Sequence, residues 1–154
     1  MPAFISVGRF LFAILFIVSG ALHLLDLAGT TEAIAAKVMM PAAISEYVTQ
    51  LEGFTGMPMA QMLAVATGAL ELVGGLAIAF NLGVRVFAVL LALFVIAATF
   101  YFHDFWNQVW PDAKGNMIQA LKNLSLIGGL LIIAGIGGGP RNAPAYTEPA
   151  PNNY

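Results

Sequence analysis

The sequence has no cysteine and few charged residues. Without cysteine, the chain itself cannot perform thiol–disulfide chemistry. Asp, Glu, Lys and Arg make up 9% of the chain, whereas a soluble domain carries about 25%. The net charge of −2 is too small to indicate a nucleic-acid partner, so we expect none. So little charge is typical of a protein that is surrounded mostly by lipid.

The sequence also lacks the short motifs of several enzyme classes. It contains no P-loop, no G-x-S-x-G, no H-E-x-x-H and no dinucleotide-binding fingerprint. We therefore assign no metal site and no catalytic residue. We expect a protein without independent catalytic activity.

Four long apolar runs make up most of the chain. Hydrophobic residues account for 60% of the sequence, and the mean hydropathy is +0.86. Each run has about 20 residues, which suffices for an α-helix to cross a hydrocarbon core of about 30 Å. We therefore predict an all-α fold, a transmembrane four-helix bundle embedded in the lipid bilayer. The predicted helices span residues 4–27, 57–80, 84–102 and 117–136 within one domain, 1–136.

The segments outside these runs differ in character. In the first connection, residues 28–56, apolar residues recur at helical spacing, which predicts an additional outer amphipathic helix over about 41–54. This helix is interpreted either as a lid over polar helix ends or as a functional gate. Residues 137–154 form a tail rich in Pro and Gly, and we expect a partner subunit to order its residues 140–154.

Basic residues indicate the orientation in the membrane. Arg9, Arg85 and Arg141 fall on one side of the predicted bundle, and Lys37 and Lys114 fall on the other. Cytoplasmic segments carry the excess of Lys and Arg in membrane proteins. We therefore predict a multi-pass protein of a bacterial-type inner (cytoplasmic) membrane with both termini in the cytoplasm.

Ionisable side chains interrupt the apolar runs, and they are the candidate site residues. An ionised group at the centre of a bilayer costs at least about 2.5 kcal/mol, so such groups have to face one another, a cavity or a ligand. At 1.5 Å rise per residue, one set lies within about 8 Å of the outer boundary. This outer set comprises His23, Asp26, His103, Asp104 and Lys122, and Trp106 follows at the same helix end as His103.

Two interpretations of the outer set stay open. One is structural, because polar residues near helix ends cap helices, anchor them at the headgroups or form ion pairs. The other is a cofactor site, because a histidine and an acid can exchange the two protons of a quinol while aromatic rings flank it. A quinone is the cofactor that this pattern allows. Haem ligation by His23 and His103 is disfavoured, because the two histidines show no haem-specific spacing.

Arg9 and Glu71 lie deeper in the runs and are predicted to be structural buried charges. Glu71 shares a helix face with Gly68 and Gly75, and small residues let helices pack closely in lipid. An unpaired carboxylate on that face could not stay ionised, so we predict that Arg9 holds it. Lys122 is the alternative partner, and a protonated Glu71 is the third option. We expect the outer set to form a separate pocket.

Several short segments occur in an order and spacing typical of one protein family. They are Gly8-Arg9, Ile17-Val18-Ser19-Gly20 with His23, Glu71-Leu72-Val73-Gly74-Gly75, Gly83-Val84-Arg85, Thr99 with Phe102-His103-Asp104-Phe105-Trp106, Lys122-Asn123-Leu124 and Gly128-Gly129. Together they resemble the DoxX family of small four-helix membrane proteins. The resemblance implies an inner-membrane protein linked with quinol-oxidising or other redox complexes, and it implies no known catalytic residue.

The membrane fold and this resemblance together predict a small accessory subunit of a larger bioenergetic membrane complex, redox or quinone-linked and active in electron transport. Such a subunit would act by packing, by holding lipid or quinone, and by anchoring other membrane-protein subunits. Two alternatives stay open. One is a stand-alone quinone-linked oxidoreductase component, and the other is a small-solute or proton carrier.

Overall fold

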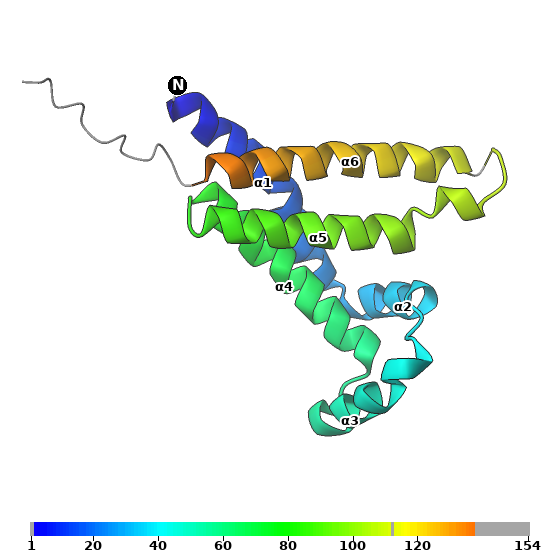
Figure 1. The fold of residues 1–154 in the computed structure, drawn as a ribbon. Helices are drawn as coiled ribbons and strands as arrows, with labels where there is room; N and C mark the ends of the chain where they lie inside the picture. The colour runs from blue at the N-terminus through cyan, green and yellow to red at the C-terminus, as the bar shows by residue number, and fades with distance from the viewer. Residues whose placement is uncertain (1, 112, 138–154) are drawn as a thin grey trace, which may run out of the picture.

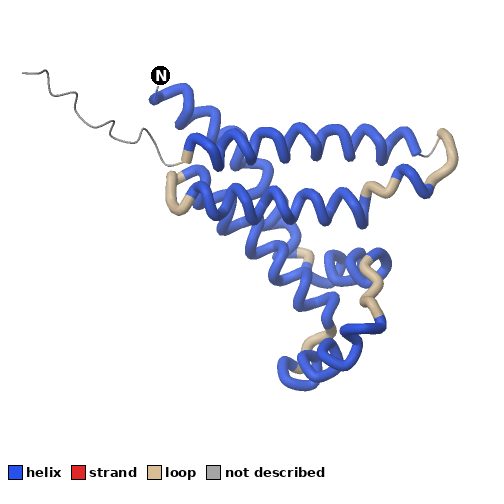
Figure 2. Tube along the Cα trace, in the orientation of Figure 1, coloured by secondary structure: helices blue, strands red, loops and turns tan. Residues whose placement is uncertain are grey.

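The computed structural model describes residues 2–111 and 113–137, and in this part of the chain short loops and turns join successive helices (Figure 2). The elements in chain order are α1 (Pro2–Leu25), α2 (Leu27–Lys37), the 3₁₀ helix η1 (Ala42–Ile44), α3 (Ser45–Thr55), α4 (Met59–Ala79), α5 (Val84–Phe102), the 3₁₀ helix η2 (Phe105–Asn107) and α6 (Ala113–Ile136). The predicted ordering of residues 140–154 by a partner concerns a segment outside the described residues.

Four of these helices, α1, α4, α5 and α6, are long and apolar enough to cross a membrane. Large apolar side chains such as Leu11, Leu93 and Ile132 are exposed on the outside of the helices, where lipid would contact them. The predicted all-α transmembrane fold with an additional amphipathic helix is confirmed, and the chain is a multi-pass membrane protein. The largest difference in helix bounds is at α6, which begins at Ala113 rather than at residue 117.

The four spanning helices form two antiparallel pairs that cross each other (Figure 1). α1 packs along α4, and α5 packs along α6. The pairs meet near the α4–α5 turn, which we call the turn end, and they diverge toward the end that carries α2 and α3, the α2 end (Figure 1). The largest fully buried side chains lie in the crossing region and come one from each helix: Phe16, Ile78, Leu91 and Leu130.

Glycines set the close approach of α1 and α4. A Cβ at Gly20 would lie 2.6 Å from the carbonyl oxygen of Gly68, and a Cβ at Gly75 would lie 3.0 Å from the backbone nitrogen of Ile17. The predicted small-residue face of α4 is confirmed, because Gly68, Glu71 and Gly75 are all buried. Small residues take the place of a hydrophobic driving force in lipid by allowing dense packing between helix backbones.

The first connection contains α2 in addition to the predicted amphipathic helix, which corresponds to η1 and α3. Helix propensity does not predict α2, because Gly29, Thr30 and Thr31 are weak helix formers. A local cap and a tertiary contact stabilise it. Asp26 caps its N-terminus by accepting a hydrogen bond from the Gly29 backbone N–H at 3.1 Å, and Ile34 is buried where α2 packs on α4.

Candidate intramembrane ligand site

A cavity of about 640 Å³ opens where the two helix pairs diverge. Its lining comes from α1, α2, α4, α5 and α6, so no single helix pair forms it. Ligand pockets in proteins have volumes of roughly 300–1,000 Å³ and mostly apolar walls, and this cavity agrees on both points. The polar residues in its lining are Ser19, His23, Asp26, Thr30, Thr67, Glu71, Tyr101, His103 and Asn123.

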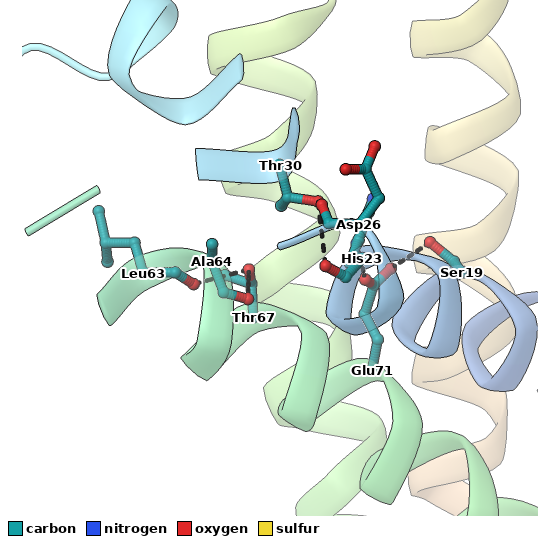
Figure 3. Close-up of polar contacts among 8 residues, drawn as sticks. All are labelled: Ser19, His23, Asp26, Thr30, Leu63, Ala64, Thr67 and Glu71. Carbon is teal, nitrogen blue, oxygen red and sulfur yellow. Dashed lines mark hydrogen bonds and ion pairs between the residues drawn. The ribbon is translucent and has the colours of Figure 1, made fainter. Parts of the chain in front are cut away.

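The carboxyl group of Glu71 is buried and hydrogen-bonded at both of its oxygens (Figure 3). The Ser19 hydroxyl donates to Oε1 at 2.9 Å. His23 Nδ1 lies 2.6 Å from Oε2, a distance that requires one proton shared between the two groups. The side chain of His23 is 41% exposed, whereas that of Glu71 is 5% exposed. Both side chains line the cavity, and His23 is the more exposed of the two.

The helix geometry explains why these three side chains meet. Ser19 and His23 are four residues apart on α1 and so share one helix face. Gly20 between them lets α4 approach, and Gly68 lies three residues before Glu71 on the facing side of α4. In an α-helix, side chains tilt toward the N-terminus. Because α1 and α4 are antiparallel, this tilt turns His23 and Glu71 toward each other.

The pair can hold or release one proton at the cavity. An ionised Glu71 fixes the shared proton on Nδ1 of His23 and leaves Nε2 as an acceptor. A protonated His23 donates from both ring nitrogens, and the pair is then a neutral ion pair, which suits a membrane interior. His23 is thus able to accept a proton from, or donate a proton to, a group in the cavity while Glu71 keeps the ring oriented.

α2 closes one side of the cavity and is tied to the same histidine. The Thr30 hydroxyl lies 3.1 Å from the His23 carbonyl oxygen and 2.8 Å from that of Asp26. Gly29, Thr30, Ala33 and Ile34 of α2 line the cavity. Any loosening of α2 would therefore open the wall next to His23.

A polar network joins α2 to the far end of α5 and to α6. Lys37 Nζ lies 3.7 Å from Asp104 Oδ1, and Gln108 Nε2 donates to the same oxygen at 3.4 Å. Asn116 Nδ2 donates to Gln108 Oε1 at 2.9 Å, and the Asn116 Oδ1 lies 3.3 Å from His103 Nδ1. The chain of contacts connects the last residue of α2 with the cavity residue His103.

The structure divides the predicted outer set. His23, Asp26 and His103 line the cavity. Asp104 lies outside the lining and joins the polar network instead. Trp106 packs its ring against Phe100 and Phe105, and Lys122 is exposed; both are also outside the lining.

The prediction that Arg9 or Lys122 holds Glu71 is wrong, and so is the prediction that the outer set forms a pocket separate from Glu71. Ser19 and His23 satisfy Glu71, and Glu71 and His23 line the same cavity. The Arg9 guanidinium donates instead to Asn81 Oδ1 at the turn end. The tilt of side chains explains this, because Arg9 on α1 is directed toward the start of α1 and away from Glu71.

Sequence reasoning missed several cavity residues. Asn123 of α6 lines the cavity and donates to Thr99 Oγ1 of α5 at 2.9 Å, while Thr30 and Thr67 come from α2 and α4. Ser19 carried the clearest signal, since it precedes His23 by one helical turn. The neutral polar residues gave no comparable signal, because lipid-facing Ser and Thr can satisfy themselves on their own helix, as Ser125 does on Leu121.

Fold and site together define a small helical membrane protein with a ligand-sized cavity between two crossed helix pairs. The chain belongs to the DoxX family, whose family model matches residues 4–104. The match covers α1 to α5 and ends at Asp104, before α6. No curated protein and no solved structure matches the chain.

Proposed function

We propose that the protein is a small accessory subunit of a redox complex in a bacterial-type inner membrane, and that it holds a quinone headgroup in the cavity. One observation carries the proposal. A histidine, oriented by a buried carboxylate, faces an otherwise mostly apolar cavity among membrane-spanning helices. A lipid-soluble ligand can reach such a site from the bilayer.

The residues of the cavity suit a quinone headgroup. A quinone has a flat apolar ring with two carbonyl oxygens, and when bound it supplies two-electron, two-proton redox chemistry. Phe16, Phe94 and Tyr101 provide aromatic walls for a ring. His23 and Asn123 lie on different helices and provide N–H donors for two oxygens. Asn123 gives one of its two N–H groups to Thr99 and keeps the other.

The role of this chain's own residues is to orient and to move protons. Glu71, itself held by Ser19, fixes the ring of His23, and His23 exchanges a proton at Nε2 with a group in the cavity. Other subunits, anchored on the exposed apolar faces of the helices, complete the complex in this proposal. Both termini are cytoplasmic in the proposal, with Arg9 and Arg85 on the cytoplasmic side.

Quinone binding is tested by titrating the detergent-purified protein with decylubiquinone and with a short-chain naphthoquinone, and by extracting and quantifying any quinone that copurifies. Wild type is expected to bind one of the two analogues. His23→Gln is expected to weaken binding by about tenfold, equivalent to one lost charge-assisted hydrogen bond. Ser125→Ala is the matched control, because Ser125 is exposed and bonded within its own helix.

Two results would reject the quinone site: wild type that binds neither analogue, or His23→Gln that binds as wild type does. The accessory-subunit role is tested separately, by purification in mild detergent and identification of the proteins that elute with the chain. Elution of the chain alone, with quinone bound, would favour a stand-alone quinone-linked component over a subunit.

A further inference from the structure

A second cavity, a groove of about 230 Å³, lies at the turn end between α1 and α6. The two cavities share no lining residue, so they are distinct. Isoleucine and phenylalanine side chains form the walls of the groove, and Arg9 is the one charged residue among the described residues that line it. The lining residues are Ile5, Gly8, Arg9, Phe12, Gly129, Ile132, Ile133, Ile136 and Gly137.

The charge of Arg9 has no anionic partner in the described part of the chain. Its Nη1 donates to the neutral side chain of Asn81, and its Nε is buried without a hydrogen-bond partner among the described residues. A guanidinium presents five N–H groups in a planar fork that matches phosphate and carboxylate oxygens. Such a group inside a membrane protein faces a cavity or pairs with an opposite charge or a backbone carbonyl.

A second guanidinium, that of Arg85, also lies at the turn end of the groove. A Cβ at Gly137 would lie 3.0 Å from both Cζ and Nη2 of Arg85, so Arg85 covers Gly137, which itself lines the groove. Gly137 has φ 65°, which favours glycine, and the neighbouring guanidinium leaves no room for a side chain. The groove therefore has an apolar body and two cations at its turn end.

We infer that this groove binds an anionic phospholipid, with its phosphate on Arg9 and Arg85 and part of an acyl chain between α1 and α6. The apolar body runs along two membrane-spanning helices, so it has the direction of a lipid chain. Arginine binds phosphate through charge-assisted, bidentate hydrogen bonds. Basic pockets between membrane-spanning helices are a recurring way to bind anionic headgroups. The inference is independent of the quinone proposal, since it uses other residues at the other end of the bundle.

The test compares delipidated protein reconstituted with phosphatidylcholine alone and with added phosphatidylglycerol. Native mass spectrometry measures the retained lipid, and a thermal shift measures its effect on stability. Wild type should retain phosphatidylglycerol preferentially and unfold at a higher temperature in its presence. Arg9→Gln should weaken this retention by about tenfold, because it removes charge-assisted hydrogen bonds. Lys122→Gln is the matched control, since Lys122 is an exposed cation of α6 outside the groove.

A second variant keeps the test decisive if Arg9→Gln does not fold. Gly8 lines the groove, and a Cβ there meets nothing within 4 Å, so Gly8→Leu should fill the groove while Arg9 stays. It should lose phosphatidylglycerol as Arg9→Gln does. Gly128→Leu is its control, because a Cβ at Gly128 also meets nothing within 4 Å and Gly128 is outside the groove.

Three outcomes would overturn the inference. Wild type could retain both lipids equally, Lys122→Gln could lose as much phosphatidylglycerol as Arg9→Gln, or Gly8→Leu could retain the lipid unchanged. A last thermal-shift measurement uses inorganic phosphate in place of the lipid. Stabilisation of wild type by phosphate alone, equal to that by phosphatidylglycerol, would also overturn it, because the apolar groove would then take no part in binding.

Discussion

At the scale of single residues, the hydrogen-bond partners of the buried Glu71 carboxyl group among the described residues both come from α1. The Ser19 hydroxyl and the His23 ring each satisfy one of its oxygens. A buried charge with one partner removed is far more costly than a buried pair replaced as a whole. The contribution of His23 to folding should therefore be large even though its own ring is partly exposed.

His23→Ala should lower the free energy of unfolding in mild detergent by about 1–3 kcal/mol, because it leaves one oxygen of the buried carboxylate unsatisfied. Glu71→Gln should cost less, since the amide keeps hydrogen bonds without the charge. Combining the two changes should show coupling of about 0.5–3 kcal/mol in a double-mutant cycle, because the residues are in contact. His103→Ala is the control, as its ring bonds to Asn116. Additive effects of His23→Ala and Glu71→Gln would contradict the pairing.

At the scale of helices, the interface between α1 and α4 determines whether the His23–Glu71 pair can form. Gly20→Ala would place a methyl group against the carbonyl of Gly68 and the backbone nitrogen of Leu72, neither of which can move aside easily. Overpacking of this kind costs about 1–3 kcal/mol. We expect lower thermal stability of the variant and weaker quinone binding together, because separating the helices also separates the pair.

Gly128→Ala is the control for this prediction, because a Cβ at Gly128 meets nothing within 4 Å. Alanine is the better helix former, so this variant should match wild type or gain about 0.5–1 kcal/mol. Equal stability of Gly20→Ala and wild type would show that α1 and α4 are not held at this distance.

The helix α2 depends on its N-terminal cap and on its packing against α4. Asp26→Ala removes the acceptor of the Gly29 N–H, and a lost cap costs about 0.5–2 kcal/mol. Faster hydrogen exchange of the amides of Leu27–Lys37, measured by mass spectrometry, is the expected result. Glu32→Ala is the control, because Glu32 is exposed on the same helix. Unchanged exchange in Asp26→Ala would mean that packing alone holds α2 in place.

At the scale of the whole molecule, the arginines and the lysines separate by helix end. Arg9 and Arg85 lie at the turn end, whereas Lys37 lies at the α2 end and Lys114 lies at the start of α6, away from the turn. Arg141 follows α6 in the sequence and gives the turn side the excess, three against two. Cytoplasmic ends of membrane helices carry the excess of basic residues, so the turn end should face the cytoplasm. The lipid inference agrees with this orientation, since anionic lipids are enriched in the cytoplasmic leaflet.

Single-cysteine labelling tests the orientation directly, because the chain has no cysteine of its own. A membrane-impermeant maleimide applied to intact cells should label Met39→Cys in the first connection and should leave Leu82→Cys in the α4–α5 turn unlabelled. Both side chains are exposed in the structure, so accessibility within the protein does not bias the comparison. Labelling of Leu82→Cys but not of Met39→Cys would reverse the assigned topology.

The sequence by itself determined the features that depend on local patterns. The length of an apolar run defines a membrane span, and the short segment Asn81-Leu82-Gly83 defines a tight turn between α4 and α5, where Asn81 and Gly83 both have positive φ. The spacing of Gly68, Glu71 and Gly75 likewise predicted the packed face of α4. Each of these signals lies within one helix or one turn and needs no knowledge of the neighbouring helices.

Only the tertiary structure decided the partner of Glu71, the cavity and the place of α2. Depth along the helices alone favoured Arg9, whereas the antiparallel packing of α1 and α4 tilts His23 and Glu71 toward each other. The cavity exists because the two helix pairs cross and diverge, and α2 lies where it does because it packs on α4 with Ile34 buried. Crossing angles and contacts between helices arise from many side chains of several helices at once, so no local pattern in the sequence specifies them.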